Sequence, residues 1–274
     1  MKSILVHVQQ DELLVPRLEA AMSLARSTGG HMSCLHVTPA DAFMAFDAFG
    51  GVHVMADVVQ ALAEQEAELR EQVSAQLANE DVSWDYEQAS GPVVGTLASR
   101  AALSDVLVVS RRPRGSLGAG ESLAAIGDLV HRIRTPLLIP GTTMKAYDPT
   151  GRVLVGWDGS YEAANAVRSG LGLLRQASSV HIVRVEDEKD AGEGLFPSTR
   201  LLEYLSRHGI HAELIVEPSG KPLAASVLLG KAASLAAQTL VIGGYSHSRL
   251  GEYLFGGVTR SLLEDCPIAL LVAH

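Results

Sequence analysis

The run RVLVGW at Arg152–Trp157 repeats the run SILVHV at Ser3–Val8, and this repetition decides the fold. Both runs are short and rich in aliphatic and β-branched residues, which is typical of strands buried inside a parallel sheet. Apolar residues at helical spacing follow each run, and a second strand-like run comes next, HMSCLHV at His31–Val37 and VHIVRV at Val180–Val185. The chain therefore presents the same succession of strand and helix twice.

The repetition continues to the end of each half. SDVLVVS at Ser104–Ser110 corresponds to AQTLVIG at Ala237–Gly243, and each half closes on a proline-led strand, TPLLIP or CPIALLVAH. Strands that alternate with helices through short connections predict an α/β fold of two tandem, doubly wound open parallel sheets related by a pseudo-two-fold axis. The Gly/Pro/Thr-rich stretch 141–152 predicts a linker, which divides the chain into domains of residues 1–146 and 147–274.

Charge and composition exclude several classes of function. The 274 residues include 22 Lys and Arg against 31 Asp and Glu, a net charge of −9. Binding to nucleic acid or to an anionic membrane needs a basic excess, so we expect neither partner. No apolar run reaches the roughly 20 residues of a membrane span, and the two cysteines and the histidines form no disulfide framework or metal-ligand motif. The sequence predicts a cytoplasmic protein without a metal site.

The glycine-rich stretch GGYSHSRLGEYLFGGVTR at Gly243–Arg260 follows the fourth strand of the second half. In an open α/β sheet, ligands bind beyond the carboxyl ends of the strands, where the strand order reverses. Glycines there let backbone N–H groups approach phosphate, and the following helix adds the positive end of its dipole and the hydroxyl of Thr259. Asp158, after the first strand of this half, faces the same crevice as a ligand contact or as the N-cap of the next helix. The alternative is a structural elbow, in which the glycines let a helix pack closely on a strand.

On VLVGWDGS and GGYSHSRLGEYLFGGVTR, the chain resembles the universal stress protein family, and because both halves share the pattern it resembles a tandem member. The resemblance implies a fold of the adenine-nucleotide alpha-hydrolase type and an adenine nucleotide, ATP or ADP with Mg²⁺, as ligand. Nucleotide-binding members carry G-2x-G-9x-G-[ST] after the fourth strand, an aspartate after the first, and a backbone contact to adenine after the second. The candidate cofactor-binding residues in this sequence are Asp158, Val185, Gly243, Ser246, His247, Gly256, Gly257, Val258 and Thr259.

Two of the four motif positions depart from the family pattern. Ser246 stands where the second glycine is expected and adds a Cβ at a point of close approach. Gly257 stands where the hydroxyl residue is expected, so Thr259 would have to supply that hydroxyl. His247 either acts on a phosphate or is an exposed loop histidine. The phosphate-binding and elbow interpretations therefore both remain open.

The first half departs further from the pattern. It has SRRPRGS at Ser110–Ser116 where the second half has GGYSHS, and Gln9 in the place of Asp158. We expect this half to bind no nucleotide in the family's way. Its Arg111, Arg112 and Arg114 either hold another anion or lie in a solvated loop. The extra loop at 39–53, rich in Met and Phe, predicts a lid over the core or an interface.

The function predicted from these features is a cytoplasmic stress-response regulatory module that binds adenine nucleotide in its second half. It is not predicted to be an enzyme, because no general base or nucleophile is placed near the crevice. Two alternatives remain, a nucleotide-free protein-interaction module and a weak ATP-hydrolysing or nucleotide-transferring enzyme. The apolar last strand of each half predicts an exposed edge, and fifth strands pair between subunits in the family. The resemblance thus implies that the two halves pair within one chain, with a homodimer as a further possibility.

Overall fold

The first half begins with the predicted strand and alternates strand and helix from there. The computed structural model describes residues 1–39, 52–112, 121–141, 144, 146–186, 196–218, 223–244 and 257–274. In chain order the first half contains β1 (Ser3–Val8), α1 (Leu14–Thr28), β2 (His31–Pro39), α3 (Val52–Leu77), β3 (Ser83–Gly91), α4 (Val93–Arg100), the 3-10 turn η1 (Ala101–Leu103), β4 (Val106–Val108), α5 (Leu123–Arg132) and β5 (Leu137–Ile139).

The second half repeats this order on a smaller scale. It contains β6 (Val153–Gly156), α6 (Tyr161–Ser169), α7 (Leu171–Leu174), β7 (Val180–Val185), α8 (Ser198–Arg207), β8 (Ala212–Glu217), α9 (Ala224–Ser234), β9 (Thr239–Gly243), α10 (Gly257–Glu264) and β10 (Ala269–Ala273). The predicted α/β class with two tandem parallel-sheet units is confirmed. The connection from β5 to β6 contains the predicted domain boundary at 146/147, whose exact position stays a prediction.

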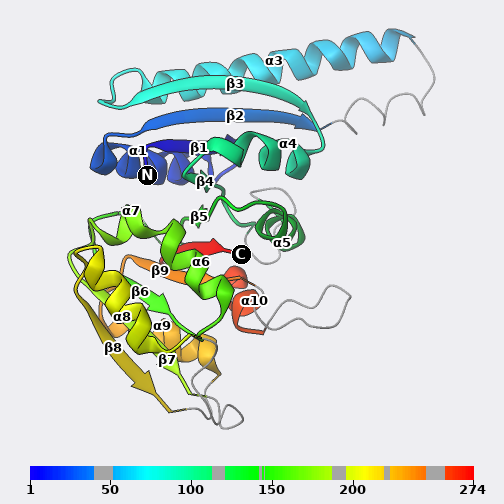
Figure 1. Ribbon diagram of the computed structural model, residues 1–274. Helices are drawn as coiled ribbons and strands as arrows, with labels where there is room; N and C mark the ends of the chain where they lie inside the picture. Colours follow the sequence, from blue (N-terminus) through cyan, green and yellow to red (C-terminus); the bar gives the residue numbers. More distant parts are fainter. Residues whose placement is uncertain are drawn as a thin grey trace.

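The strands of both halves join into one sheet, in the order β3-β2-β1-β4-β5-β10-β9-β6-β7-β8 (Figure 1). Pairing is parallel within each half, and the halves meet where β5 and β10 pair antiparallel, with Leu138 opposite Leu271. Both strands are fully buried there. The predicted pairing of the two apolar last strands within one chain is therefore confirmed.

The antiparallel junction sets the direction of each half. The strands of the first half end at one edge of the sheet, which we call the first carboxyl edge. The strands of the second half end at the opposite edge, which we call the second carboxyl edge. Each edge therefore lies beside the amino ends of the other half's strands.

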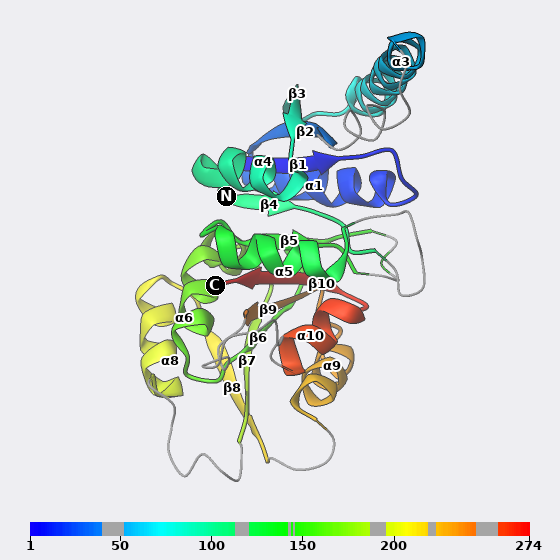
Figure 2. The same cartoon turned by 90° about the vertical axis from the view of Figure 1, so that its right-hand side faces the viewer.

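Helices cover both faces of the sheet. One apolar layer includes side chains from α1, α3, α6 and α8, and the other includes side chains from α4, α5, α9 and α10. Figure 2 shows α6 and α8 on one side of the second half's strands and α9 and α10 on the other. Because each layer draws residues from both halves, the two halves share a core rather than merely touching.

The long helix α3 extends past the end of the sheet (Figure 1). Its last turns bury the apolar residues Leu69, Val73 and Leu77, whereas Val59 nearer its start is 48% exposed. The predicted lid or interface at 39–53 includes the end of β2 and the start of α3, and its residues 40–51 lie outside the described residues.

Candidate functional site

The second carboxyl edge has its switch point between β6 and β9. These two strands are parallel neighbours, with Val155 opposite Val241. From β6 the chain proceeds outward to β7 and β8, and then returns to β9 and continues inward to β10. Side chains and loops that follow β6 and β9 therefore flank the place where open α/β sheets bind ligands.

Asp158 lies at this edge, two residues beyond the end of β6. Its side chain is exposed, and its Oδ1 accepts hydrogen bonds from the Ser160 backbone N–H at 3.0 Å and from Ser160 Oγ at 2.6 Å. Ser160 Oγ in turn accepts from the Ala163 N–H at 3.1 Å, which makes Ser160 the N-cap of α6. The interpretation of Asp158 as the N-cap is therefore wrong. Asp158 orients the capping serine from an exposed position at the edge.

Gly243 ends β9 against the first turn of α6. A Cβ at this position would lie 2.4 Å from the Ala163 backbone N and 2.6 Å from the Glu162 carbonyl carbon. No side chain fits at those distances, so close packing alone requires a glycine here. This observation supports the elbow interpretation for the first glycine of the stretch, although the helix it accommodates is α6 rather than the helix that follows the stretch.

The start of α10 differs from Gly243. A Cβ on Gly257 would meet no described atom within 4 Å. Gly257 and Val258 are exposed, and Thr259 is buried with 6% of its surface accessible. Packing within the described structure thus gives no reason for glycine at 257. The first N–H groups of α10 have no acceptor within the helix, and residues 245–256, which precede the helix, lie outside the described residues.

Val185 ends β7, next to β6 in the sheet, where Val183 pairs with Gly156. It is half-buried and packs against the core layer of α9 and α10. The edge thus brings Asp158, Val185, Gly243 and the start of α10 to one side of the sheet. Three predicted site residues, Ser246, His247 and Gly256, lie outside the described residues.

Aromatic residues beside Asp158 were not predicted as part of the site. The Trp157 indole N–H donates to the Phe196 carbonyl at 3.2 Å, and the Phe196 N–H donates to the Gly159 carbonyl at 3.1 Å. Phe196 also stacks edge-on against Tyr161, with ring centroids 4.8 Å apart, and Tyr161 is 62% exposed. This aromatic rim joins the end of β6 to the residues just before α8. The sequence signal was the aromatic pair around DGS in a chain with only 5% aromatic residues.

The first carboxyl edge contains buried ion pairs between its own side chains. His7 Nδ1 lies 2.9 Å from Glu121 Oε1, and Arg17, which is 1% exposed, pairs with Asp11 at 3.4 Å. Burial raises the pKa of Glu121, but the hydrogen bond and charge of His7, with the charges of two arginines, outweigh it and hold that pKa below its ordinary value. The expectation that this half binds no nucleotide stays a prediction, and these pairs supply a physical reason for it.

The arginines after β4 do not lie as expected. Arg111 is 5% exposed, and its guanidinium donates to backbone carbonyls at the end of α10 in the other half. The expectation that Arg111 binds an anion or lies in a solvated loop is therefore wrong. The Arg112 side chain is half-buried, and its backbone N–H donates to the Glu121 carbonyl at 2.8 Å. Arg114 lies outside the described residues.

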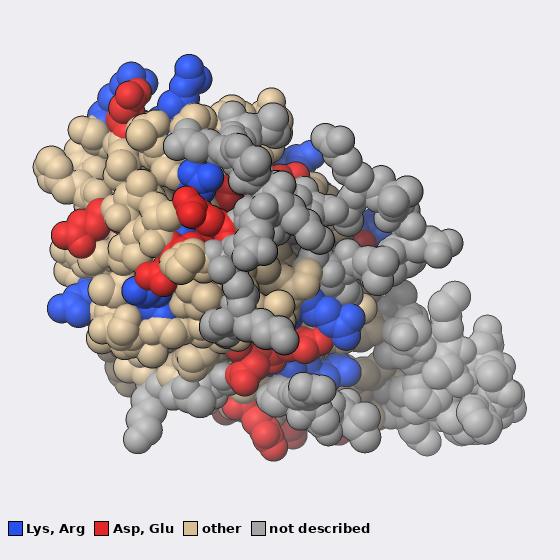
Figure 3. Space-filling view, turned by 90° about the horizontal axis from the view of Figure 1, so that it is seen from below, with Lys and Arg blue, Asp and Glu red and all other residues tan. Residues whose placement is uncertain are grey.

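The described part of the chain offers little for other kinds of site. Among the described residues there is no group of three or more His, Cys, Asp or Glu side chains placed to hold a metal ion. None of the helices in the described part combines the length and apolarity that a membrane crossing requires. On the face shown in Figure 3, the described basic side chains lie interspersed with acidic ones.

Two solved structures share the whole arrangement. A universal stress protein from Archaeoglobus fulgidus DSM 4304 matches with a TM-score of 0.74 at 15% identity, over 98% of this chain and 97% of that one. The chain has a tandem universal stress protein fold. A functionally unknown protein from Pseudomonas aeruginosa PAO1 matches with a TM-score of 0.60 at 18% identity, over 100% of this chain and 92% of that one. The sequence matches no protein-family model, and no curated protein matches it significantly. The resemblance expected from the two motifs is thus confirmed through the fold.

Proposed function

We propose that the second half binds an adenine nucleotide at its carboxyl edge, and that the protein is a stress-response regulatory module rather than an enzyme. The observation that carries the proposal is the meeting of Asp158, Val185 and the start of α10 at the switch point of a tandem universal stress protein fold. Asp158 would accept hydrogen bonds from ribose hydroxyls, and the backbone at Val185 would contact the adenine edge. The first N–H groups of α10 would bind phosphate, with ATP or ADP carrying its Mg²⁺.

The regulatory role follows from what the edge offers chemically. Hydrolysis or transfer of a phosphoryl group needs a positioned base or a nucleophile at the phosphates. The described residues at the edge offer a carboxylate, to which we assign the ribose, and backbone N–H groups, to which we assign the phosphates. We therefore propose that the nucleotide acts by changing the conformation of the edge, and that any ATP hydrolysis runs well below about one turnover per second.

Close packing at Gly243 favours a second candidate, a nucleotide-free interaction module. Because the α6 backbone already requires a glycine there, that glycine is not evidence for phosphate binding. In this case the edge would be a structural elbow, and the surfaces of the protein would carry its function. The two candidates differ in one measurable property, the binding of nucleotide by the intact chain.

The test is a calorimetric titration of refolded protein with Mg-ATP, preceded by mass spectrometry of any nucleotide released on denaturation. We expect the wild type to bind, and Asp158→Ala to bind about tenfold more weakly, which corresponds to about 1.4 kcal/mol. Asp148→Ala is the matched control, because Asp148 Oδ1 accepts from the Thr150 N–H at 2.9 Å and from Thr150 Oγ1 at 2.7 Å. The Asp148→Ala variant loses the same kind of local turn at the opposite edge of the sheet, so its affinity for Mg-ATP should equal that of the wild type.

Either of two results would contradict the proposal. If the wild type releases no nucleotide and shows no binding heat at millimolar Mg-ATP, the interaction module is favoured. If both alanine variants lose affinity equally, the loss reflects a disturbed turn rather than a contact from Asp158 to the ligand.

A further inference from the structure

The Arg111 side chain of the first half forms hydrogen bonds to the carboxyl end of α10 in the second half. Its Nη1 donates to the carbonyls of Leu262 at 3.1 Å and Leu263 at 3.0 Å, and its Nη2 donates to the carbonyl of Cys266 at 3.1 Å. These three acceptors are more than 150 residues away along the chain and are buried together with Arg111. A single guanidinium therefore connects the end of β4 with the last turn of α10.

The chemistry of a helix end explains why an arginine suits this place. The last carbonyls of an α-helix have no donor within the helix, and they carry the negative end of its dipole. A guanidinium offers several N–H donors in a fixed plane together with a positive charge. Arg111 thus donates to three buried carbonyls at the end of α10, and it holds that end of the helix in one orientation.

The other end of α10 lies in the candidate nucleotide site. The helix contains eight residues, Gly257–Glu264, so it is about 12 Å long at 1.5 Å per residue. Because the halves join antiparallel, α10 runs from the second carboxyl edge, where Gly257 lies, to the first, where Arg111 lies. A helix this short has no point at which it can bend without breaking its hydrogen bonds, and its Leu262 and Leu263 are fully buried. Fixing its last turn therefore also fixes the direction of its first N–H groups.

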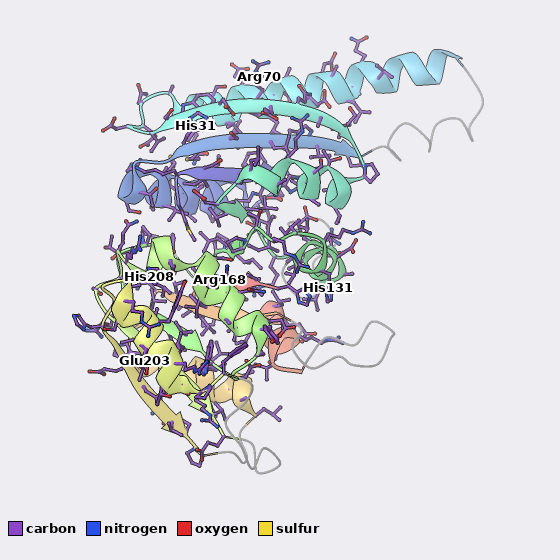
Figure 4. All side chains as sticks on the ribbon, viewed as in Figure 1. His31, Arg70, His131, Arg168, Glu203 and His208 are labelled. Carbon is purple, nitrogen blue, oxygen red and sulfur yellow. The ribbon has the colours of Figure 1, made fainter. Side chains whose placement is uncertain are left out.

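A reciprocal contact exists at the corresponding place in the other half, where Gly244 faces the end of α5. A Cβ on Gly244 would lie 2.8 Å from Val130 Cγ1, and the Gly244 carbonyl lies 2.9 Å from His274 Nδ1. His131, labelled on α5 in Figure 4, packs edge-on against His274 with ring centroids 5.1 Å apart. Each half thus contacts the last helix of the other, and the first half does so with a charged hydrogen-bond donor.

We propose that Arg111 is a positioning residue for the nucleotide site of the second half, because it holds α10 by the end farthest from the ligand. This inference rests on the proposed function above. Without Arg111, the end of α10 would loosen and its first N–H groups would no longer be fixed at the phosphate. The first half would therefore bind no nucleotide itself and would serve the site of the second half.

The experiment compares Arg111→Met, which keeps the side-chain stem and removes every donor, with Arg111→Lys, which restores a charged donor. We expect Mg-ATP affinity to fall about tenfold in the methionine variant, equivalent to about 1.4 kcal/mol, and to recover in part in the lysine variant. The matched control is Arg152→Met. Arg152 Nη1 donates at 2.8 Å to the carbonyl of Leu235, which ends α9 within the same half, so this variant should bind like the wild type.

A second readout does not involve the nucleotide. Cys266 and Cys34 are both buried, one beside the Arg111 contact and one in the first half. In the full-length Arg111→Met protein, we expect iodoacetamide to alkylate Cys266 several-fold faster than in the wild type, with the rate at Cys34 unchanged. A variant that merely folds poorly would instead expose both thiols together. In that case the labelling rates and the affinity are compared between the wild type and Arg111→Lys.

The outcomes separate this inference from the proposed function. Wild-type binding with an unchanged affinity in Arg111→Met overturns the role of Arg111 and leaves the nucleotide site intact. An unchanged rate of alkylation at Cys266 in that variant likewise contradicts the proposal that Arg111 holds the end of α10 in place. A wild type that binds no nucleotide overturns both proposals, whatever the thiol rates are. Weaker binding together with faster labelling of Cys266 alone supports the inference.

Discussion

The two halves share a backbone plan but differ at the ends of their central strands. In register, Val6 pairs with Val108 and Val155 pairs with Val241, so Ser110 corresponds to Gly243 and Arg111 to Gly244. Likewise His7 in β1 corresponds to Gly156 in β6. The first half places a polar or charged side chain at each of these positions, and the second half places glycine at each. The repeat has thus kept the fold and changed what lies at the carboxyl edge.

This difference shows how one fold can serve two roles in a single chain. At the first edge, the side chain of His7 lies against Glu121 and that of Arg17 against Asp11, and all four side chains are largely buried. At the second edge, the Asp158 side chain is exposed. An edge whose charged side chains are buried against one another is suited to supporting the fold, and an edge with an exposed carboxylate is suited to binding.

The largest expected effect comes from exchanging the residues at the ends of β4 and β9. We expect Gly243→Ser to lower the free energy of unfolding by about 3 kcal/mol, because its Cβ would collide with the α6 backbone rather than with a movable side chain. The reverse exchange, Ser110→Gly, should cost less than about 1 kcal/mol, since it adds only chain entropy to the unfolded state. Urea denaturation of both variants measures the difference.

The comparison would fail if the two substitutions lowered the free energy of unfolding by the same amount. That result would mean that α6 can shift to accept a Cβ at Gly243, and the close approach would no longer explain the glycine. The phosphate-binding interpretation of Gly243 would then gain support.

The second prediction concerns the buried pair at the first edge. Replacing Glu121 with Gln removes a charge that is hydrogen-bonded to His7 in a site 9% exposed, so we expect a loss of about 2 kcal/mol near neutral pH. Because the folded-state pKa of Glu121 lies below its ordinary value of 4.5, its ionised form stabilises the fold above that value. This contribution is lost as the pH falls through the folded-state pKa.

The measurement is urea denaturation of the wild type and Glu121→Gln between about pH 7 and about pH 3. The difference in free energy of unfolding between the wild type and Glu121→Gln should narrow as the solution becomes acidic. Glu87→Gln is the control, because Glu87 pairs with Arg100 at 2.9 Å with both side chains nearly half exposed. Such a pair contributes at most about 1 kcal/mol, and a gap for Glu121 that is constant with pH would contradict the assigned pKa shift.

Most of the fold could be predicted from the sequence because strand and helix periods report which face of an element is buried. The run predicted at Ser3–Val8 forms β1 over the same residues, and the two apolar closing strands pair as expected. Periodicity reports burial but not the identity of a partner. The contact of His7 with Glu121, and that of Arg111 with α10, join residues more than 100 positions apart. No local pattern places these partners together.

The candidate site was predictable in part for the same reason. Asp158 and Val185 follow strands whose order the repeat fixes, so their common edge could be inferred. The aromatic rim could not be predicted in full, because Phe196 is far along the chain from Trp157 and Gly159 and meets them only in the folded structure. Arg111 was misjudged because a run of arginines in a loop normally faces water, whereas here the end of a helix in the other half provides carbonyl acceptors.

The smallest expected effect concerns a capping serine in each half, Ser122 at the start of α5 and Ser160 at the start of α6. Ser122 Oγ accepts from the Ala125 N–H, and Ser160 Oγ accepts from the Ala163 N–H, each at 3.1 Å. We expect Ser122→Ala to cost about 1 kcal/mol. Ser160→Ala should cost slightly more, by about 0.5 kcal/mol, because it also loses the exposed hydrogen bond to Asp158.

A double-mutant cycle of Asp158→Ala and Ser160→Ala would measure that additional bond, for which we expect a coupling near 0.5 kcal/mol. The coupling matters for the nucleotide titration, because part of any effect of Asp158→Ala on binding passes through the start of α6. If Ser160→Ala alone weakens Mg-ATP binding as much as Asp158→Ala does, the aspartate acts by holding α6. If Ser160→Ala loses stability and keeps its affinity, the carboxylate itself contacts the nucleotide, and the second edge differs from the first in chemistry as well as in packing.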